Sequence, residues 1–377
     1  MTDLLGRIWW SGEAGWAGAA LALPLAVAEA LFRTGAALRG ALYGSGLLRS
    51  ARAAAPVVSI GNLAVGGAGK TPAAIAVARR LLARGRTVAI LSRGYGAERA
   101  DARIVSDGSR VLLDALSGGD EPVLVARRLP AARVLCGPRR ADLARTAVRD
   151  LGADALLLDD GFQHRALARD LDVVVLDAAN PFGNRRLLPA GPNREPRSAL
   201  RRAGLVWLSR ADQADPGVLA ALRALAREST GRDAVESRHA PVDVVDGCLD
   251  RGFGPDALRG RRVLLLAGIA RPDGFRRTLT AMGADVAAER IFPDHHRFAR
   301  GDLEAAFRDV GAAGCDLVVT TEKDAVRLPP DVAANPLLRA VRIEAEIVRG
   351  AEILDAALDA VLRPTTPSAA STAARHG

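Results

Sequence analysis

The chain of 377 residues contains little lysine, methionine, tyrosine or cysteine. Cys136, Cys248 and Cys315 lie far apart and form no CxxC pair, which excludes a disulfide framework and is typical of a reducing compartment. Lys70 and Lys323 are the only lysines among 52 basic residues, so both positions are candidates for a specific role. Aromatic residues make up 4% of the chain and no basic stripe is interleaved with them, which argues against nucleic-acid binding.

What the sequence does contain is sufficient for folded domains. Hydrophobic residues make up 49% of the chain and charged residues 25%, which excludes collagen-like, low-complexity and wholly disordered proteins. At roughly 100–200 residues per domain, the length indicates two domains. The net charge of +9 fits an anionic lipid or a phosphorylated substrate better than DNA.

An apolar segment near the N-terminus is the only membrane signal. Residues 16–32 are apolar except for Glu29, contain Pro24, and at about 17 residues are at the short limit for crossing a bilayer. Tryptophans before the segment and arginines after it favour the headgroup region. We expect a helix embedded shallowly in a membrane interface; a helical arm packed on the protein and a full crossing are the alternatives.

From residue 56 onward, short β-branched runs alternate with amphipathic stretches rich in alanine and arginine. The predicted strands of the first half are residues 57–60, 88–91, 133–136, 155–159, 173–177 and 205–209. The predicted helices are residues 72–84, 120–128, 139–151 and 216–227. Apolar strands separated by helices indicate an α/β fold with a parallel sheet covered on both faces.

This alternation weakens between residues 229 and 260, where we place a domain junction. A second α/β stretch follows, with strands at 263–267, 285–291 and 317–321 and helices at 272–282, 300–310 and 352–362. The predicted organisation is an N-terminal membrane-associating helical segment (1–50), a larger α/β domain (51–230), a smaller α/β domain (231–363) and a disordered tail (364–377).

The strongest motif is a glycine-rich turn between a predicted strand and a predicted helix. Residues 61–72 read GNLAVGGAGKTP, and they end in Gly69, Lys70 and Thr71 at the start of the helix. Glycines let backbone N–H groups converge on phosphate oxygens, and the helix N-terminus adds a positive dipole. Lys70 would reach the β- and γ-phosphates and Thr71 would ligate Mg²⁺. Ala64 departs from the strict pattern, which has glycine there.

Two acidic pairs accompany this loop. Asp159 and Asp160 end an apolar strand, the position from which a P-loop enzyme orients Mg²⁺, although spacing does not decide which of them does so. Asp120 and Glu121 open a predicted helix, where acidic residues are also favoured on local grounds alone. Residues 208–212 (LSRAD) lack the Asn-Lys-x-Asp pattern of a guanine reader, so a GTP switch is disfavoured.

The ordered set of motifs between residues 56 and 327 resembles the tetraacyldisaccharide 4'-kinase family, the lipid A 4'-kinases of Gram-negative bacteria. The motifs are residues 60–62, 66–72, 92–96, 119–122, 159–164, 183–184, 187–192, 194–196, 292–298 and 321–326. The resemblance implies ATP-dependent phosphorylation of the 4'-hydroxyl of a tetraacyl glucosamine disaccharide 1-phosphate. It also implies a P-loop domain, a smaller second domain and an N-terminal membrane-associating helix on the cytoplasmic face of the inner membrane.

The resemblance further implies roles for individual residues. Asp120 would be the catalytic base, with His295 favoured over His296 as its partner and with Lys70 assisting the transfer. The remaining residues form three sets: nucleotide binding (Gly66, Gly67, Ala68, Gly69, Lys70, Thr71), magnesium (Thr71, Glu121, Asp159, Asp160) and substrate or loop closure (His164, Arg194, Glu195). Lys323 would lie in the cleft without an assigned role. The cofactors would be ATP and Mg²⁺; no obligate protein partner is indicated.

A P-loop ATPase that drives conformational change or delivers a metal is the alternative function. The apolar N-terminal segment and the Asp120–Glu121 pair favour a lipid kinase, because a soluble switch needs neither.

Overall fold

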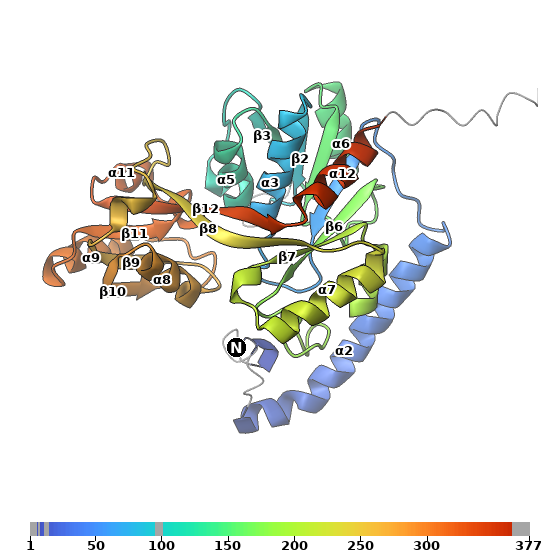
Figure 1. The fold of residues 1–377 in the computed structure, drawn as a ribbon, viewed down its shortest axis with the longest axis horizontal. Coiled ribbons are helices and arrows are strands. Elements are labelled where there is room, and N and C mark those ends of the chain that lie inside the picture. Colours follow the sequence, from blue (N-terminus) through green and yellow to red (C-terminus); the bar gives the residue numbers. More distant parts are fainter. Residues whose placement is uncertain (1–5, 7, 11–14, 95–100, 364–377) are drawn as a thin grey trace, which may run out of the picture.

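The computed structural model describes residues 6, 8–10, 15–94 and 101–363. Within them a single twelve-stranded sheet runs through the molecule in the order β10-β9-β11-β12-β8-β7-β6-β1-β5-β2-β4-β3. Figure 1 shows the strands β8 and β12 passing from one half of the molecule to the other. Residues 95–96 of one family motif and the tail predicted to be disordered (364–377) lie outside the described residues.

The first half is a doubly wound parallel sheet. Its strands are β7 (Leu205–Ser209), β6 (Leu171–Asp177), β1 (Val57–Gly61), β5 (Ala155–Asp159), β2 (Val88–Ser92), β4 (Arg133–Cys136) and β3 (Arg103–Asp107). Neighbouring strands pair parallel except β3, which pairs antiparallel with β4 at the edge. Strands β1, β2 and β5 are buried along their whole length, which explains their uninterrupted apolar sequence.

Helices cover both faces of this half. The helices are α3 (Lys70–Ala83), α5 (Asp120–Arg128), α6 (Arg140–Arg149), α7 (Pro216–Thr230) and α12 (Ala351–Leu362). One apolar core joins α3, α5 and α12 to the sheet, and two others join α6 and α7 to its opposite face. Alternate strand residues serve the two faces, as Val57 and Val58 do in β1.

The second half continues the same sheet. It contains β8 (Val235–Asp246), β9 (Arg262–Ala267), β10 (Asp285–Ile291), β11 (Leu317–Thr321) and β12 (Leu338–Arg349), with the helices α8 (Pro272–Ala281) and α9 (Arg300–Ala312). Strands β8 and β12 pair antiparallel over most of their length, whereas β9, β10 and β11 are parallel. The α/β prediction, with a parallel P-loop sheet and a smaller second part, is confirmed.

The shorter elements are α4 (Ala115–Gly118), α10 (Glu322–Ala325) and α11 (Pro330–Ala333), together with 3-10 turns at Arg197–Arg202, Ala211–Gln213 and Pro255–Leu258.

The predicted strands and helices are all present, with ends that differ by a few residues, but three strands escaped prediction. Strand β3 lies at an edge of the sheet. Strands β8 and β12 form a long two-stranded ribbon with many polar, half-buried residues, so neither has the apolar run that predicts a buried strand. The predicted junction at 229–260 contains β8. Helix α12, which we assigned to the smaller domain, packs instead in the core of the P-loop half. The domain boundaries themselves stay a prediction.

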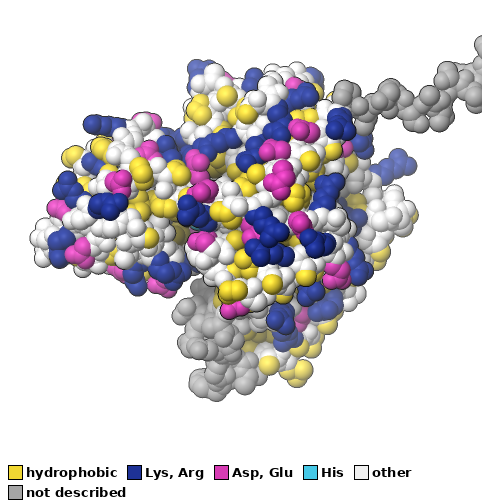
Figure 2. All heavy atoms as spheres, in the orientation of Figure 1, with side chains coloured by type: hydrophobic (Ala, Val, Ile, Leu, Met, Phe, Trp, Pro, Cys, Tyr) yellow, Lys and Arg dark blue, Asp and Glu magenta, His cyan; other side chains and the backbone are white. Residues whose placement is uncertain are grey.

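The N-terminal helix α2 (Gly15–Gly44) is longer than the predicted segment 16–32. Its stretch Ala20–Gly44 is long and apolar enough to cross a membrane by length and composition, and only 6% of its most apolar window is buried. Leu23, Val27 and Leu31 are among its exposed apolar side chains. Figures 1 and 2 show α2 along the lower edge of the molecule with hydrophobic side chains at the surface.

Because Leu358 of α12 is fully buried in the core of the P-loop half, we expect Leu358→Ala to lower the free energy of unfolding by about 2–5 kcal/mol. The exposed Glu352 of the same helix provides the control, since Glu352→Ala should change stability by less than about 0.5 kcal/mol. Urea unfolding of both variants measures the difference. Equal effects of the two changes would show that α12 does not contribute to this core.

Candidate active site

The glycine-rich loop connects the end of β1 at Gly61 to the start of α3 at Lys70. Gly66 and Gly69 have φ angles of 98° and 84°, in the left-handed region that favours glycine. A Cβ at Gly69 would also lie 2.9 Å from Nε2 of His239, so this position excludes a side chain on two grounds. The loop therefore directs its chain sharply into the N-terminus of α3, the arrangement that holds phosphate groups.

Two residues that sequence reasoning did not select hold this loop in place. Ser209 Oγ donates to the carbonyl oxygen of Ala68 (2.7 Å), and Arg210 Nη2 donates to that of Gly67 (2.6 Å). Arg210 also pairs with Asp177 at 2.6 Å. Both residues belong to the segment 208–212 that lacks a guanine-reading pattern. In the structure this segment binds two carbonyl oxygens of the phosphate loop.

Lys70, the first residue of α3, lies beside an ion pair at the end of β5. Its Nζ is 3.7 Å from Asp160 Oδ1, and Arg194 Nη1 donates to both carboxylate oxygens of Asp160 at 2.9 and 2.8 Å. Burial would raise the pKa of Asp160, but the charges of Lys70 and Arg194 outweigh it and the pKa lies below its usual value. Asp160 is therefore a carboxylate held between two cations.

Asp159, the neighbouring residue, is only partly compensated: the charge of Lys70 and the N–H of Asp160 lower its pKa by less than the opposing effects raise it. Burial and the negative charges of Glu121 and Asp160 raise its pKa to about 7, and its Oδ1 has no hydrogen-bond partner. A buried, unpartnered carboxylate oxygen facing other carboxylates fits a divalent cation, which would neutralise the repulsion. No group of three His, Cys, Asp or Glu side chains among the described residues could hold an ion alone.

The Asp120–His295 pair joins the two halves of the molecule. His295 Nδ1 lies 2.8 Å from Oδ2 of Asp120, which is buried at the start of α5. Burial would raise the pKa of Asp120, but the hydrogen bond with His295 and the charge of Lys323 bring it below its usual value. The same hydrogen bond raises the pKa of His295. The pair therefore consists of an ionised carboxylate that the ring of His295 orients.

Lys323 and His296 also receive definite positions. Lys323 Nζ lies 3.2 Å from His295 Nε2 and 3.8 Å from Glu121 Oε1, so it joins this cluster. His296 instead pairs with Asp302 at 2.9 Å and stacks on Phe292 with the ring centroids 4.5 Å apart. The structure thus brings His295, and not His296, to Asp120. Spacing alone could not separate two adjacent histidines.

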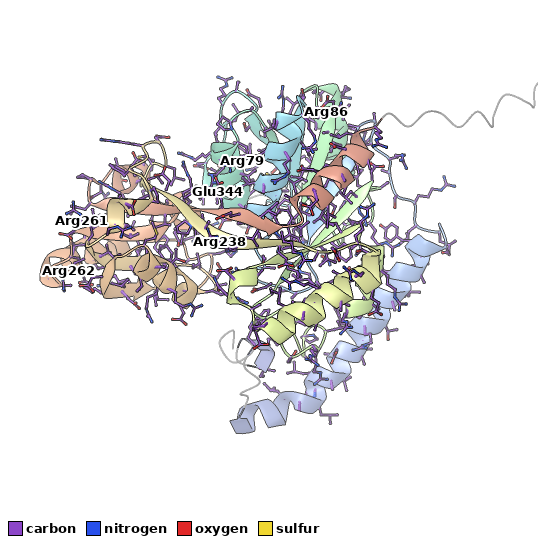
Figure 3. The ribbon with its side chains drawn as sticks, viewed as in Figure 1. Arg79, Arg86, Arg238, Arg261, Arg262 and Glu344 are labelled. Carbon is purple, nitrogen blue, oxygen red and sulfur yellow. The ribbon has the colours of Figure 1, made fainter. Side chains whose placement is uncertain are left out.

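A buried ion-pair network holds α5 against the second half. Arg128, at the end of α5, donates to Glu322 at 2.6 Å and to Glu344 of β12 at 2.8 Å. Arg79 of α3 reaches the same Glu344 at 2.5 Å, and Figure 3 labels both of these side chains where α3 meets β12. Because Glu322 directly precedes Lys323, the network ties the segment of Lys323 to α5, the helix that begins at Asp120.

The predicted substrate residues have different surroundings. Burial and the charge of Arg140 lower the pKa of His164 to about 4, and its Nε2 has no hydrogen-bond partner. Glu195 pairs with Arg202 at 2.8 Å, whereas the adjacent Arg194 faces Asp160. Arg140 is a buried cation near the aspartates that sequence reasoning missed, because arginine is so frequent in this chain that no single one stands out.

Asp159→Asn should stabilise the protein at high pH in the absence of divalent cations. Because the folded-state pKa of about 7 lies above the usual 3.8, the wild type loses stability as the pH rises from about 4 through about 7. We expect the melting temperature of the variant to exceed that of the wild type at pH 8, with the difference shrinking toward pH 4. Asp150→Asn, at an exposed carboxyl, should show no such gain. A difference independent of pH would contradict the assignment.

Comparison with known proteins places this geometry in a family. Residues 21–363 match the family model described as tetraacyldisaccharide-1-P 4'-kinase. A protein from Anaeromyxobacter sp. (strain Fw109-5) named tetraacyldisaccharide 4'-kinase is 70% identical, with 94% of this chain and 96% of that protein aligned. One of the same name from Syntrophus aciditrophicus is 42% identical over 82% and 85% of the two chains.

A solved structure agrees. The crystal structure of LpxK from Aquifex aeolicus in complex with ATP is 28% identical, with a TM-score of 0.74, and the alignment covers 92% of this chain and 99% of that one. The match of the family model over most of the chain, together with relatives of high identity, establishes the relationship. The chain belongs to the tetraacyldisaccharide-1-P 4'-kinase family.

Proposed function

We propose that the chain transfers the γ-phosphate of ATP to the 4'-hydroxyl of a tetraacyl glucosamine disaccharide 1-phosphate, forming lipid IV-A in lipid A biosynthesis. The observation that carries this proposal is the Asp120–His295 pair at the N-terminus of α5. Beside it lies the acidic cluster, which consists of Glu121, Asp159 and Asp160, and Asp160 contacts Lys70 of the phosphate loop. Family membership and the ATP complex of the Aquifex aeolicus protein support it. Nothing observed favours the alternative of a conformational ATPase or metal-delivery protein.

In this mechanism Asp120 accepts the proton of the sugar hydroxyl as that oxygen attacks phosphorus. His295 keeps Asp120 ionised and oriented, since its ring nitrogen binds one carboxylate oxygen at 2.8 Å. Gly66, Gly67, Ala68 and Gly69 would direct their N–H groups to the phosphates, and Lys70 would stabilise the charge on the transferred group. Catalysis is then mainly positioning and charge stabilisation.

The residues proposed to hold Mg²⁺ are Thr71, Glu121, Asp159 and Asp160. The unpartnered Oδ1 of Asp159 and the raised pKa of this residue support a cation beside it. A bound Mg²⁺ would neutralise charge on the phosphates during transfer. Asp160, already paired with Lys70 and Arg194, is better placed to orient the lysine than to ligate the ion directly.

The proposed substrate set consists of His164, Arg194 and Glu195. Arg194 is next to the site through its pair with Asp160, and a guanidinium suits an anionic or hydroxyl-rich headgroup. The half-buried neutral ring of His164 follows Asp160 by four residues, and the carboxylate of Glu195 belongs to the residue after Arg194. These assignments derive from the family resemblance.

We further propose that α2 associates with the cytoplasmic face of the inner membrane, as a peripheral or N-terminally anchored segment. Its exposed side chains include Leu23 (74%), Val27 (55%) and Leu31 (71%), which water alone would not favour on one helix. An acyl-chain substrate resides in a membrane, so an apolar helix on the enzyme would bring the two together. Neither nucleic acid nor an obligate protein partner enters the proposal.

The test of the reaction is transfer of labelled γ-phosphate from ATP to the disaccharide lipid, with and without Mg²⁺. We expect Lys70→Ala and Asp120→Ala each to lower turnover by about 10²-fold or more, because each removes a charge clamp or a general base. Asp150→Ala, at an exposed carboxylate, is the control and should leave turnover unchanged. Wild-type rates for Asp120→Ala would remove it from the mechanism.

The test of the membrane helix uses the full chain. We expect the double variant Leu23→Asp and Leu31→Asp to bind vesicles of anionic phospholipid at least about tenfold more weakly, since burying a charge in lipid is unfavourable. Val348→Asp changes an apolar residue on β12 that is 53% exposed, and this variant should bind like the wild type. Co-sedimentation measures binding; equal loss in both variants would refute a specific role for α2.

A further inference from the structure

In α2 an acidic residue, Glu29, is buried while leucines are exposed, the reverse of the usual arrangement in a surface helix. It is the only acidic residue in α2, and it is also the only buried residue of that helix among positions 20–44. Its residue exposure is 5%, whereas Leu23 and Leu31 in the same helix are more than 70% exposed. A helix that packed on the protein through apolar contacts alone would bury its leucines. The burial of the acid instead requires a specific partner.

The partners are the backbone and a side chain of one loop. Glu29 Oε1 accepts the N–H of Leu187 at 2.9 Å, and Oε2 accepts from Arg186 Nε at 2.7 Å. Arg33, one turn further along α2, donates to Oε1 at 3.1 Å. A buried carboxylate with three charge-assisted or backbone hydrogen bonds is a stable link between α2 and the rest of the protein.

We call residues 183–194 the bridging loop, because its other side is bound to the phosphate loop. Val65 N–H donates to the carbonyl oxygen of Pro192 at 2.8 Å, and Arg194 N–H donates to that of Leu63 at 2.6 Å. The bridging loop ends in Arg194, whose guanidinium binds Asp160 beside Lys70. A continuous set of hydrogen bonds thus runs from Glu29 to the acidic cluster.

A second contact of α2 leads to the same cluster from another direction. Arg165 donates from Nη1 to the carbonyl oxygen of Gly40 at 3.0 Å, and its guanidinium lies 5.2 Å from the ring centroid of Tyr43. Arg165 directly follows His164 in the segment that begins at Asp159 and Asp160. Both contacts between α2 and the body of the protein therefore lie on segments that carry candidate site residues.

We propose that Glu29 is a positioning residue for phosphoryl transfer: it holds the bridging loop so that Arg194 stays on Asp160, and it thereby sets the membrane-facing helix in a fixed relation to the phosphate loop. Glu29 acts through this loop and does not touch the nucleotide or the lipid. The inference rests on the proposed kinase function, because the contact it protects is the one that orients Lys70.

The experiment compares Glu29→Ala and Glu29→Gln with Thr34→Ala, a control at an exposed position of the same helix. Three quantities are measured on the full chain: hydrogen exchange of residues 183–194, turnover of the lipid acceptor, and co-sedimentation with vesicles of anionic phospholipid. We expect Glu29→Ala to exchange the Leu187 amide at least about tenfold faster and to lower kcat about tenfold, with vesicle binding within about twofold of wild type.

Glu29→Gln keeps an acceptor for the Leu187 N–H but loses the charge that binds Arg186, so both effects should be smaller than with Ala. If Glu29→Ala unfolds the chain, the Gln variant and Arg186→Ala, which removes only one partner, provide the same comparison. Thr34→Ala should leave the exchange of the bridging loop and kcat unchanged.

Wild-type exchange in Glu29→Ala would show that Glu29 does not hold the loop, and faster exchange with unchanged kcat would show that the loop does not position the site. Equal loss of vesicle binding and kcat would assign Glu29 to the placement of α2 alone. Each of these results overturns the proposal. A wild-type protein that transfers no phosphate would instead refute the proposed function, and the exchange rates would still decide whether Glu29 holds the loop.

Discussion

Four carboxylates gather where the strands of the first half end, and the free energy required to bring them together constrains the rest of the site. Asp120 is stabilised by His295 and Lys323, and Asp160 by Lys70 and Arg194. Asp159 is left between Glu121 and Asp160 with an unpartnered oxygen and a raised pKa. Added positive charge would favour the ionised form of Asp159 at neutral pH, and a nucleotide-bound cation would supply that charge.

The groups that stabilise these acids come from distant parts of the chain. His295 and Lys323 belong to the second half, and Asp120 to the first, so the site exists only because β8 and β12 join the halves in one sheet. The buried pairs of Arg128 with Glu322 and Glu344 hold α5 against this connection. A shift between the halves would separate Asp120 from His295 and leave an uncompensated buried charge, which is strongly unfavourable.

The N-terminal helix α2 is also held in place by a charged residue, which attaches it to the segments beside the site. An apolar helix that interacts only with lipid would be free to rotate and slide relative to the active site. In this chain α2 is bound at Glu29 and at Gly40 to two segments that flank the acidic cluster. If α2 binds the membrane as proposed, this attachment would hold the phosphate loop at a defined height relative to the acyl chains of the substrate, which gives a physical reason for the only acid of α2 to face the protein.

The sequence by itself determined the P-loop strand, turn and helix, the parallel sheet of the first half and the family, because these depend on local patterns such as GGAGKT and on apolar runs of strand length. Tertiary structure alone decided three things: the pairing of His295 rather than His296 with Asp120, the role of Ser209 and Arg210 beneath the phosphate loop, and the buried position of Glu29. Each of these depends on a contact between residues more than a hundred positions apart. Adjacent or frequent residue types look alike in a sequence, and only the packing of the chain distinguishes them.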